Sequence, residues 1–327
     1  MLEIIASFIK QAIIQGIPLL YGSTGEILTE KSGNLNLGIP GIMYIGGISG
    51  VIGAYFYEKA VVDINPFLCV MIPLLCSILG SVLMALIYCF LTVTLRANQN
   101  VTGLALTTFG VGVGNFFGGS LSSLFGEGGS ISLIRTGACF KATLPFASKL
   151  GLFGDTFLSF GFLAYLAIVI ALLCSWFLNR TRAGLSLRAV GESPATADAA
   201  GINVTKYKYL ATCIGAAIAG LGGLYFIMDY IGGAWTNGGF GDRGWLAIAL
   251  VIFALWKPKY SILGSILFGG LYIVYLYIPG LSRSSQEIFK MLPYVVTIVV
   301  LIVLSICNRR ENQPPESLGL SYFREDR

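Results

Sequence analysis

Long apolar runs, each about 20 residues in length, constrain this chain more than any other feature of its sequence. The mean hydropathy is +0.79, and only 11% of the 327 residues are charged, whereas a soluble domain carries about 25%. Lipid offers no hydrogen bonds to the backbone, so an apolar run of this length must pair its own polar groups as a helix. The sequence therefore predicts an all-α fold, a polytopic transmembrane helical bundle.

The runs predict about nine membrane spans, and any number from about eight to ten fits the pattern. The expected spans are residues 2–20, 37–56, 66–95, 101–124, 157–178, 209–231, 245–256, 262–278 and 292–306. The third run is long enough to tilt or to break at Pro73, and the seventh is short enough to end inside the bilayer. Residues 1–308 are expected to form one transmembrane domain, and residues 309–327 a short cytoplasmic tail.

A polar segment, residues 187–204, interrupts the apolar pattern between two of these spans. Ser193 can act as an N-cap, Pro194 suits the first helical position, and Gly201 can provide the positive φ that ends a helix. These signals predict a short helix from Pro194 to Ala200 that faces water. An isolated helix of this length is marginal in water, so it needs a partner surface. The alternative interpretation is an ordinary solvated loop.

Basic residues indicate how the chain is oriented. The region from Arg180 to Lys208, Lys257 with Lys259, and Arg309 with Arg310 all fall on one side when spans are counted between them. The positive-inside rule makes that side cytoplasmic, which places the C-terminus inside and the N-terminus outside. The net charge of +5 is spread over loops, so nucleic acid is not an expected partner.

The sequence lacks the residues that several kinds of catalytic or metal-binding site require. The chain has no histidine, which excludes Ser-His-Asp catalysis and His-ligated zinc, and it has no Gly-Lys dipeptide for a phosphate-binding loop. Its seven cysteines occur singly, without a CxxC pair, and are interpreted as packing residues. No catalytic residue, metal site or cofactor is expected, so the chain is not expected to be an enzyme. The spans are expected to hold few ionisable residues beyond Lys10 and Asp229, which disfavours an ion-coupled carrier.

Small residues recur at four-residue spacing in the run 209–231, which predicts close helix packing. They are Ala216 and Gly220, beside Gly215, Ala219 and Gly223. The glycine-rich stretch from Gly110 to Gly119 is interpreted as a packing seam. Asn115 within it either lines a water-filled path or bonds to a neighbouring helix.

Four stretches carry a resemblance to a known family. They are residues 25–38 with Gly41, residues 95–106, residues 187–204 and residues 243–250, supported by residues 291–295 and 315–319. Together they resemble the permease subunit of an ATP-binding-cassette (ABC) importer. The branch they resemble handles nucleosides and simple sugars and pairs with lipoproteins of the basic-membrane-protein type.

The resemblance implies a role for the polar segment, which would dock on the ATPase as a coupling helix. The residues that would carry this role are Arg188, Gly191, Glu192, Pro194, Ala197, Asp198, Ala200 and Gly201. The implied partners are a separate ABC ATPase subunit, a second homologous permease subunit in a heterodimer, an extracytoplasmic substrate-binding lipoprotein and the lipid of a bacterial cytoplasmic membrane. The implied substrate is a nucleoside, with riboflavin or a simple sugar as alternatives.

Polar groups near helix breaks are the candidates for the translocation path. They are Asn34, Asn36, Asn98, Gln99, Asn115, Asp229, Trp235, Asn237 and Asp242. Amides can pair with ribose hydroxyls or base edges, and an aromatic ring can stack on a base. The alternative for each Asn is a helix cap, and for Trp235 a place in the interfacial aromatic belt.

Overall fold

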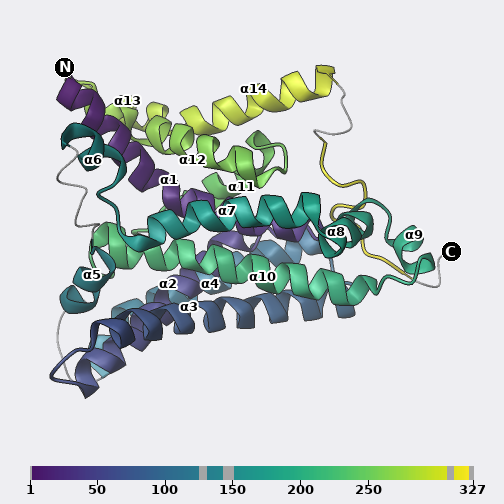
Figure 1. The fold of residues 1–327 in the computed structure, drawn as a ribbon, viewed down its shortest axis with the longest axis horizontal. Coiled ribbons are helices and arrows are strands. Elements are labelled where there is room, and N and C mark those ends of the chain that lie inside the picture. The colour runs from purple at the N-terminus through teal and green to yellow at the C-terminus, as the bar shows by residue number, and fades with distance from the viewer. Residues whose placement is uncertain (1, 125–130, 143–150, 308–312, 324–327) are drawn as a thin grey trace.

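The computed structural model describes residues 2–124, 131–142, 151–307 and 313–323. These residues form a bundle of helices, and their one β-contact is a bridge between Ser132 and Ala234. The elements are α1 (Leu2–Glu30), α2 (Ile39–Ala60), α3 (Pro66–Cys89) with the π-helical η1 (Phe90–Thr94), α4 (Gln99–Leu124), α5 (Ile134–Phe140), α6 (Gly151–Phe157), α7 (Phe162–Arg180), α8 (Arg182–Glu192), α9 (Pro194–Ala199), α10 (Val204–Tyr225) with the π-helical η3 (Phe226–Ile231), α11 (Arg243–Phe253), α12 (Pro258–Ile273) with the 3₁₀ turn η4 (Val274–Tyr277), α13 (Arg283–Lys290) and α14 (Leu292–Cys307) (Figure 1).

Among the described residues, 8 helices are long and apolar enough to cross a membrane, and α11 is a further, shorter apolar helix. This confirms the predicted polytopic bundle and the short seventh run. The third run does not break at Pro73: α3 continues through this residue, and η1 extends the helix beyond Cys89. The chain is a multi-pass membrane protein.

Short helices and connections gather at the two ends of the bundle (Figure 1). We call one end the α9 end, since it holds α8, α9 and residues 313–323. We call the other the α5 end, since it holds the N-terminal part of α1, together with α5, α6 and α13. The Lys31 carbonyl lies against Gly191 of α8, and Trp256, the residue before Lys257, bonds Glu30, so the end of α1 and Lys257 lie at the α9 end. Arg309 and Arg310 lie outside the described residues.

The first helix extends well past the predicted end at Leu20, to Glu30. This brings Glu26 and Glu30, which are 0% and 3% exposed, inside the bundle. The expectation that spans hold few ionisable residues beyond Lys10 and Asp229 is therefore wrong. Groups outside the helix bond these carboxyls: the Asn36 backbone N–H donates to Glu26 Oε1 at 3.0 Å, and Trp256 Nε1 donates to Glu30.

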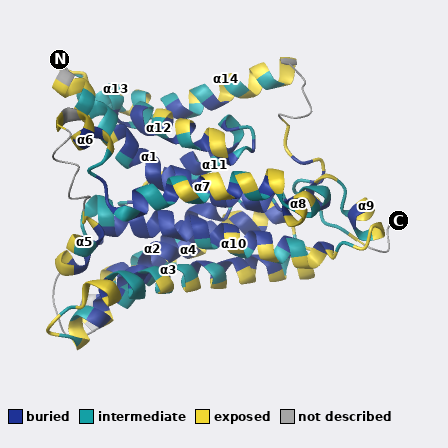
Figure 2. Cartoon of the chain, viewed as in Figure 1, coloured by how far each residue is buried: buried dark blue, intermediate teal, exposed yellow. Residues whose placement is uncertain are grey.

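Close glycine contacts hold the centre of the bundle, where α10 packs against α1, α2 and α3. A Cβ added at Gly220 would collide with Ser81 of α3, and one at Gly46 of α2 would collide with the Gly220 backbone. The predicted close packing of the small-residue run is thereby confirmed. The outward faces of α3 and α14 remain exposed (Figure 2), with apolar side chains such as Leu79 and Ile302.

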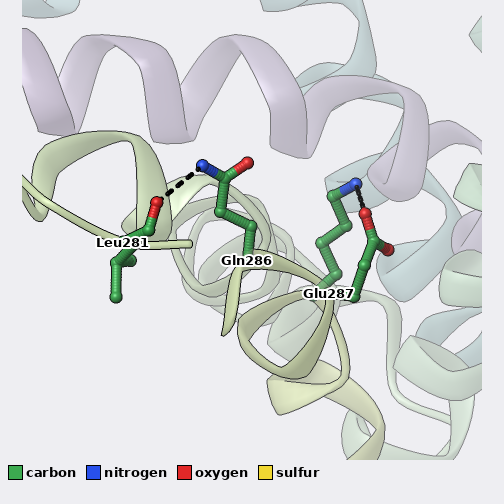
Figure 3. Close-up of polar contacts among 4 residues, drawn as sticks. Leu281, Gln286 and Glu287 are labelled. Atoms are coloured by element: carbon green, nitrogen blue, oxygen red, sulfur yellow. Dashed lines mark hydrogen bonds and ion pairs between the residues drawn. The ribbon is translucent and has the colours of Figure 1, made fainter. Parts of the chain in front are cut away.

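At the α5 end, α13 is a short polar helix that precedes the last long apolar helix (Figure 3). Lys290 Nζ donates to Glu287 Oε1 at 2.7 Å, and Gln286 Nε2 donates to the Leu281 carbonyl at 3.4 Å. These local contacts suit a helix that lies at the edge of a membrane.

Candidate functional site

The polar segment folds as two helices, α8 and α9. The predicted short helix is confirmed as α9, where Ser193 Oγ accepts a hydrogen bond from the Thr196 N–H at 3.4 Å, Pro194 opens the helix and Gly201 has φ +82. The preceding helix α8 was not expected. Thr181 Oγ1 begins it by accepting from the Gly184 N–H at 3.0 Å.

The predicted coupling residues divide into an inner and an outer group. Gly191 and Ala197 are buried, and Ala197 packs with Val190 and Val204 in a small apolar cluster. The others are partly or fully exposed: Arg188, Glu192, Pro194, Asp198, Ala200 and Gly201. Small exposed residues, Ala195 and Ala199 among them, complete the outer surface of α9. This surface is narrow and carries no bulky apolar side chain, so a cleft in another protein could receive it closely.

Gly191 fixes this segment to the rest of the bundle. A Cβ at Gly191 would collide with the Lys31 carbonyl, so only glycine lets α8 approach the connection between α1 and α2 this closely. Burial lowers the pKa of Lys31 below its ordinary value of 10.5, and the charge of Glu192 opposes that shift. The C-terminal turn of α8 is thus packed closely against the residues that follow α1.

Three path candidates meet at the buried connection between α1 and α2: Asn34 and Asn36 lie in it, and Gln99, the first residue of α4, lies against it. Asn34 Nδ2 donates to Thr212 Oγ1 at 3.0 Å, and Asn36 Oδ1 accepts from the Gly38 N–H at 3.0 Å. Gln99 Oε1 accepts from the Leu35 N–H at 2.7 Å, and its side chain is 3% exposed. Asn36 and Gln99 thus satisfy backbone N–H groups of a turn that lies inside protein, and Asn34 connects this turn to α10.

Asn98 and the two acidic candidates lie elsewhere. Asn98 is exposed, and its Oδ1 accepts from the Val101 N–H at 3.1 Å, as an N-cap does. Asp229, in η3, lies against Gly161 at the start of α7. Asp242 is exposed at the N-cap position of α11. Asn98 thus directly precedes Gln99, which bonds the α1–α2 connection, and no hydrogen bond to that connection is seen for Asp229 or Asp242 among the described contacts.

The remaining three candidates meet between α4 and the loop 232–242. Trp235 Nε1 donates to Asn237 Oδ1 at 2.8 Å, and the Gly238 N–H donates to Asn115 Oδ1 at 3.3 Å. The Trp235 ring lies against Gly114 and is 6% exposed. We call Asn115, Trp235 and Asn237 the loop cluster. The cavity lined by Trp235 measures ≈ 10 Å³, the space of about one water molecule.

A buried cation, not singled out from the sequence, supports the loop 232–242 next to this cluster. Arg243 begins α11 and is 8% exposed. Its Nη1 donates to the Phe240 carbonyl at 2.9 Å, and its Nη2 donates to Gln15 Oε1 of α1 at 2.8 Å. Its guanidinium also lies over the Phe226 ring, 4.5 Å from the centroid. The position of Arg243 between a loop and an apolar run was the only local signal in the sequence, and its partner Gln15 on α1 lies far away along the chain.

Comparison with known proteins shows the family. The model of the branched-chain amino acid transport system / permease component family matches residues 8–301. The chain belongs to this permease family. The resemblance drawn from the sequence is thereby confirmed.

Relatives of the permease span nearly its whole length. It is 32% identical to the nucleoside ABC transporter permease protein NupC of Lactococcus lactis, over 90% of each chain. It is 31% identical to the putative glucose ABC transporter permease protein TsgC13 of Haloferax volcanii, over 98% of each chain. It is 28% identical to the guanosine ABC transporter permease protein NupQ of Bacillus subtilis, over 91% of this chain and 92% of the relative.

Proposed function

We propose that this permease is the membrane subunit of an ABC importer that carries a nucleoside across a bacterial cytoplasmic membrane. The observation that carries the coupling part of this proposal is α9, a capped short helix whose outer surface is free of bulky side chains and whose inner side is fixed to α1 through Gly191. ATP hydrolysis takes place on a separate ATPase subunit. The nucleoside and guanosine permeases among the relatives support the substrate.

A simple sugar is the second candidate substrate, since a putative glucose permease matches over a similar share of the chain. Nucleosides carry a ribose, so both substrates offer hydroxyl groups to amide side chains. Uptake assays with labelled guanosine, uridine and glucose distinguish the two classes.

The orientation follows from the basic residues. The α9 end, with Arg188, Lys206 and Lys257, is the cytoplasmic end, so the C-terminal segment lies inside the cell. The α5 end then faces outward, where a substrate-binding lipoprotein delivers its ligand. A second, homologous permease subunit completes the transporter as a heterodimer.

The loop cluster is the part of the predicted path that the structure favours, because Asn115, Trp235 and Asn237 combine amides with an aromatic ring. Asp242 is exposed at the end of the same loop. A cavity of ≈ 10 Å³ holds no nucleoside, so the substrate passes when the loop moves or at the boundary with the second subunit. Asn34, Asn36, Asn98, Gln99 and Asp229 remain proposed path residues with weaker support.

Substitution on the outer surface of α9 tests the function. Ala199→Trp adds bulk to an exposed position, so the permease should insert normally, while ATPase co-purification and nucleoside uptake fall by about tenfold or more. Leu185→Trp is the matched control, since Leu185 of α8 is already large and 60% exposed. Full uptake by Ala199→Trp would count against α9 as the docking element.

A further inference from the structure

The segment after α14 returns to the α9 end and lies across it. We call residues 315–323 the strap. The Ser317 N–H and Ser317 Oγ both donate to the Gly191 carbonyl, at 3.1 and 2.5 Å. The Gly319 N–H donates to the Gly33 carbonyl at 3.1 Å. The strap thus joins the end of α8 to the connection between α1 and α2.

The second half of the strap reaches α9 and the start of α4. Tyr322 Oη donates to Asp198 Oδ2 of α9 at 2.9 Å. Gln99 Nε2 of α4 donates to the Leu320 carbonyl at 3.4 Å. The guanidinium of Arg96, just before α4, lies over the Phe323 ring at 4.5 Å from its centroid.

Burial, backbone conformation and packing all fix the strap in this position. Pro315 and Ser317 are buried, and Gly319 has φ +79, a conformation that favours glycine. Tyr322 also packs against the apolar cluster formed by Val190, Ala197 and Val204. Networks of hydrogen bonds between rigid elements are among the contacts through which a displacement can pass from one element to another.

We propose that the strap is a mechanical link that passes a displacement of α9 to the α1–α2 connection and to α4. This inference rests on the proposed function, in which α9 docks on the ATPase. α4 carries Asn115 of the loop cluster, so a displacement of its first turn reaches the candidate path along one helix. Tyr322 and Ser317 are positioning residues in this scheme, because they act through α9 and α8.

Point variants in the complete transporter test the link. Tyr322→Phe and Ser317→Ala each remove one hydrogen bond to the coupling segment, and the double variant removes both. Ser321→Ala is the matched control, since Ser321 lies in the same segment, half-buried. The measurement is the number of nucleoside molecules transported per ATP hydrolysed in proteoliposomes that contain the ATPase, both permeases and the lipoprotein.

The double variant should lower this ratio by about fivefold, with each single variant giving part of the loss, because each lost hydrogen bond weakens the link. The amount of ATPase that co-purifies should stay unchanged, as should the ratio in Ser321→Ala. This result would support the strap as a link.

Two outcomes would overturn it. Transport and ATP hydrolysis that fall in proportion, with the ratio constant, would mean that the strap only stabilises the fold. Loss of the ATPase from the purified double variant would mean that the strap is a docking surface instead. Failure of the proposed function itself is distinguishable, because the unaltered permease would then bring down no ATPase. If the double variant misfolds, the two single variants give the same comparison.

Discussion

At the scale of single residues, the structure gives Arg243 and Asn115 different tasks on the same loop. Arg243 donates to the Gly239 and Phe240 carbonyls of the loop and also to Gln15 of α1. It thereby fixes the loop to α1. Asn115 holds it from α4, through the Gly238 N–H. The first side chain is buried, so its removal acts on stability. The second is half-buried and belongs to the proposed path, so its removal acts on transport.

Arg243→Leu should lower the free energy of unfolding by about 2–3 kcal/mol, because it leaves buried carbonyl and amide oxygens without a donor. The check is the thermal unfolding of the purified permease in detergent. Arg283→Leu, at an exposed position in α13, is the control and should unfold close to the unaltered protein. Equal melting temperatures for both variants would contradict the supporting role of Arg243.

Asn115→Leu should lower nucleoside uptake by about fivefold, since it removes a polar group that holds the loop cluster in place. Assembly with the partners should not change. Thr108→Val is the control on the same helix, because Thr108 is exposed and bonds only to the Leu104 carbonyl one turn before it among the described contacts. Unaltered uptake by Asn115→Leu would remove Asn115 from the path.

At the scale of elements, α9 depends on its cap more than on its length. A helix from Pro194 to Ala199 has few internal hydrogen bonds, so the bond from the Thr196 N–H to Ser193 Oγ is a large share of what orders it. The apolar contact of Ala197 with Val190 and the hydrogen bond from Tyr322 to Asp198 also hold it. The helix is therefore rigid only while it stays capped and packed on α8.

Ser193→Ala should speed amide hydrogen exchange in α9 by about fivefold, which corresponds to the loss of about 1 kcal/mol from an N-cap. Exchange measured on peptides that cover α9 and α13 gives the test. Ser282→Ala removes the cap of α13 in the same way and is the matched control, since it should affect α13 alone. Faster exchange in both helices after either substitution would indicate a global effect instead.

Local signals predicted α9, because Ser193, Pro194 and Gly201 act within a few residues of one another. The same reasoning missed the last part of α1. There, Asn36 bonds Glu26 and Trp256 bonds Glu30. Because Trp256 lies far along the chain, no local sequence pattern predicts this contact. The sequence also indicated Asn115, Trp235 and Asn237 as separate polar candidates. That they lie together could not be predicted, because it depends on how the loop folds against α4.

At the scale of the whole molecule, the bundle has a tightly packed centre and a more open side. The central helices α1, α2, α3 and α10 approach through small residues, such as Gly25 of α1 facing Gly215 of α10. α14 packs on α11 and α12 and exposes most of its apolar surface (Figure 2). The centre is therefore the part most sensitive to added volume.

Gly220→Val should prevent accumulation of folded permease, because its side chain would collide with Ser81 and press on the Ser77 carbonyl of α3. Gly112→Val is the matched control, since a Cβ at Gly112 meets nothing within 4 Å. Size-exclusion chromatography of the detergent extracts compares them. A monodisperse peak for Gly220→Val, equal to that of Gly112→Val, would show that the centre tolerates more volume than its contacts indicate.

The position of residues 315–323 also bears on how the permease is made. They follow α14, so the ribosome has already released every membrane helix before it releases Ser317 and Tyr322. A nascent chain can be fully inserted by the translocon and still lack the contacts that fasten α8 and α9 to the ends of α1 and α4. Biosynthesis thus orders the two events: the helices enter the bilayer first, and the surface proposed to dock on the ATPase is completed afterwards.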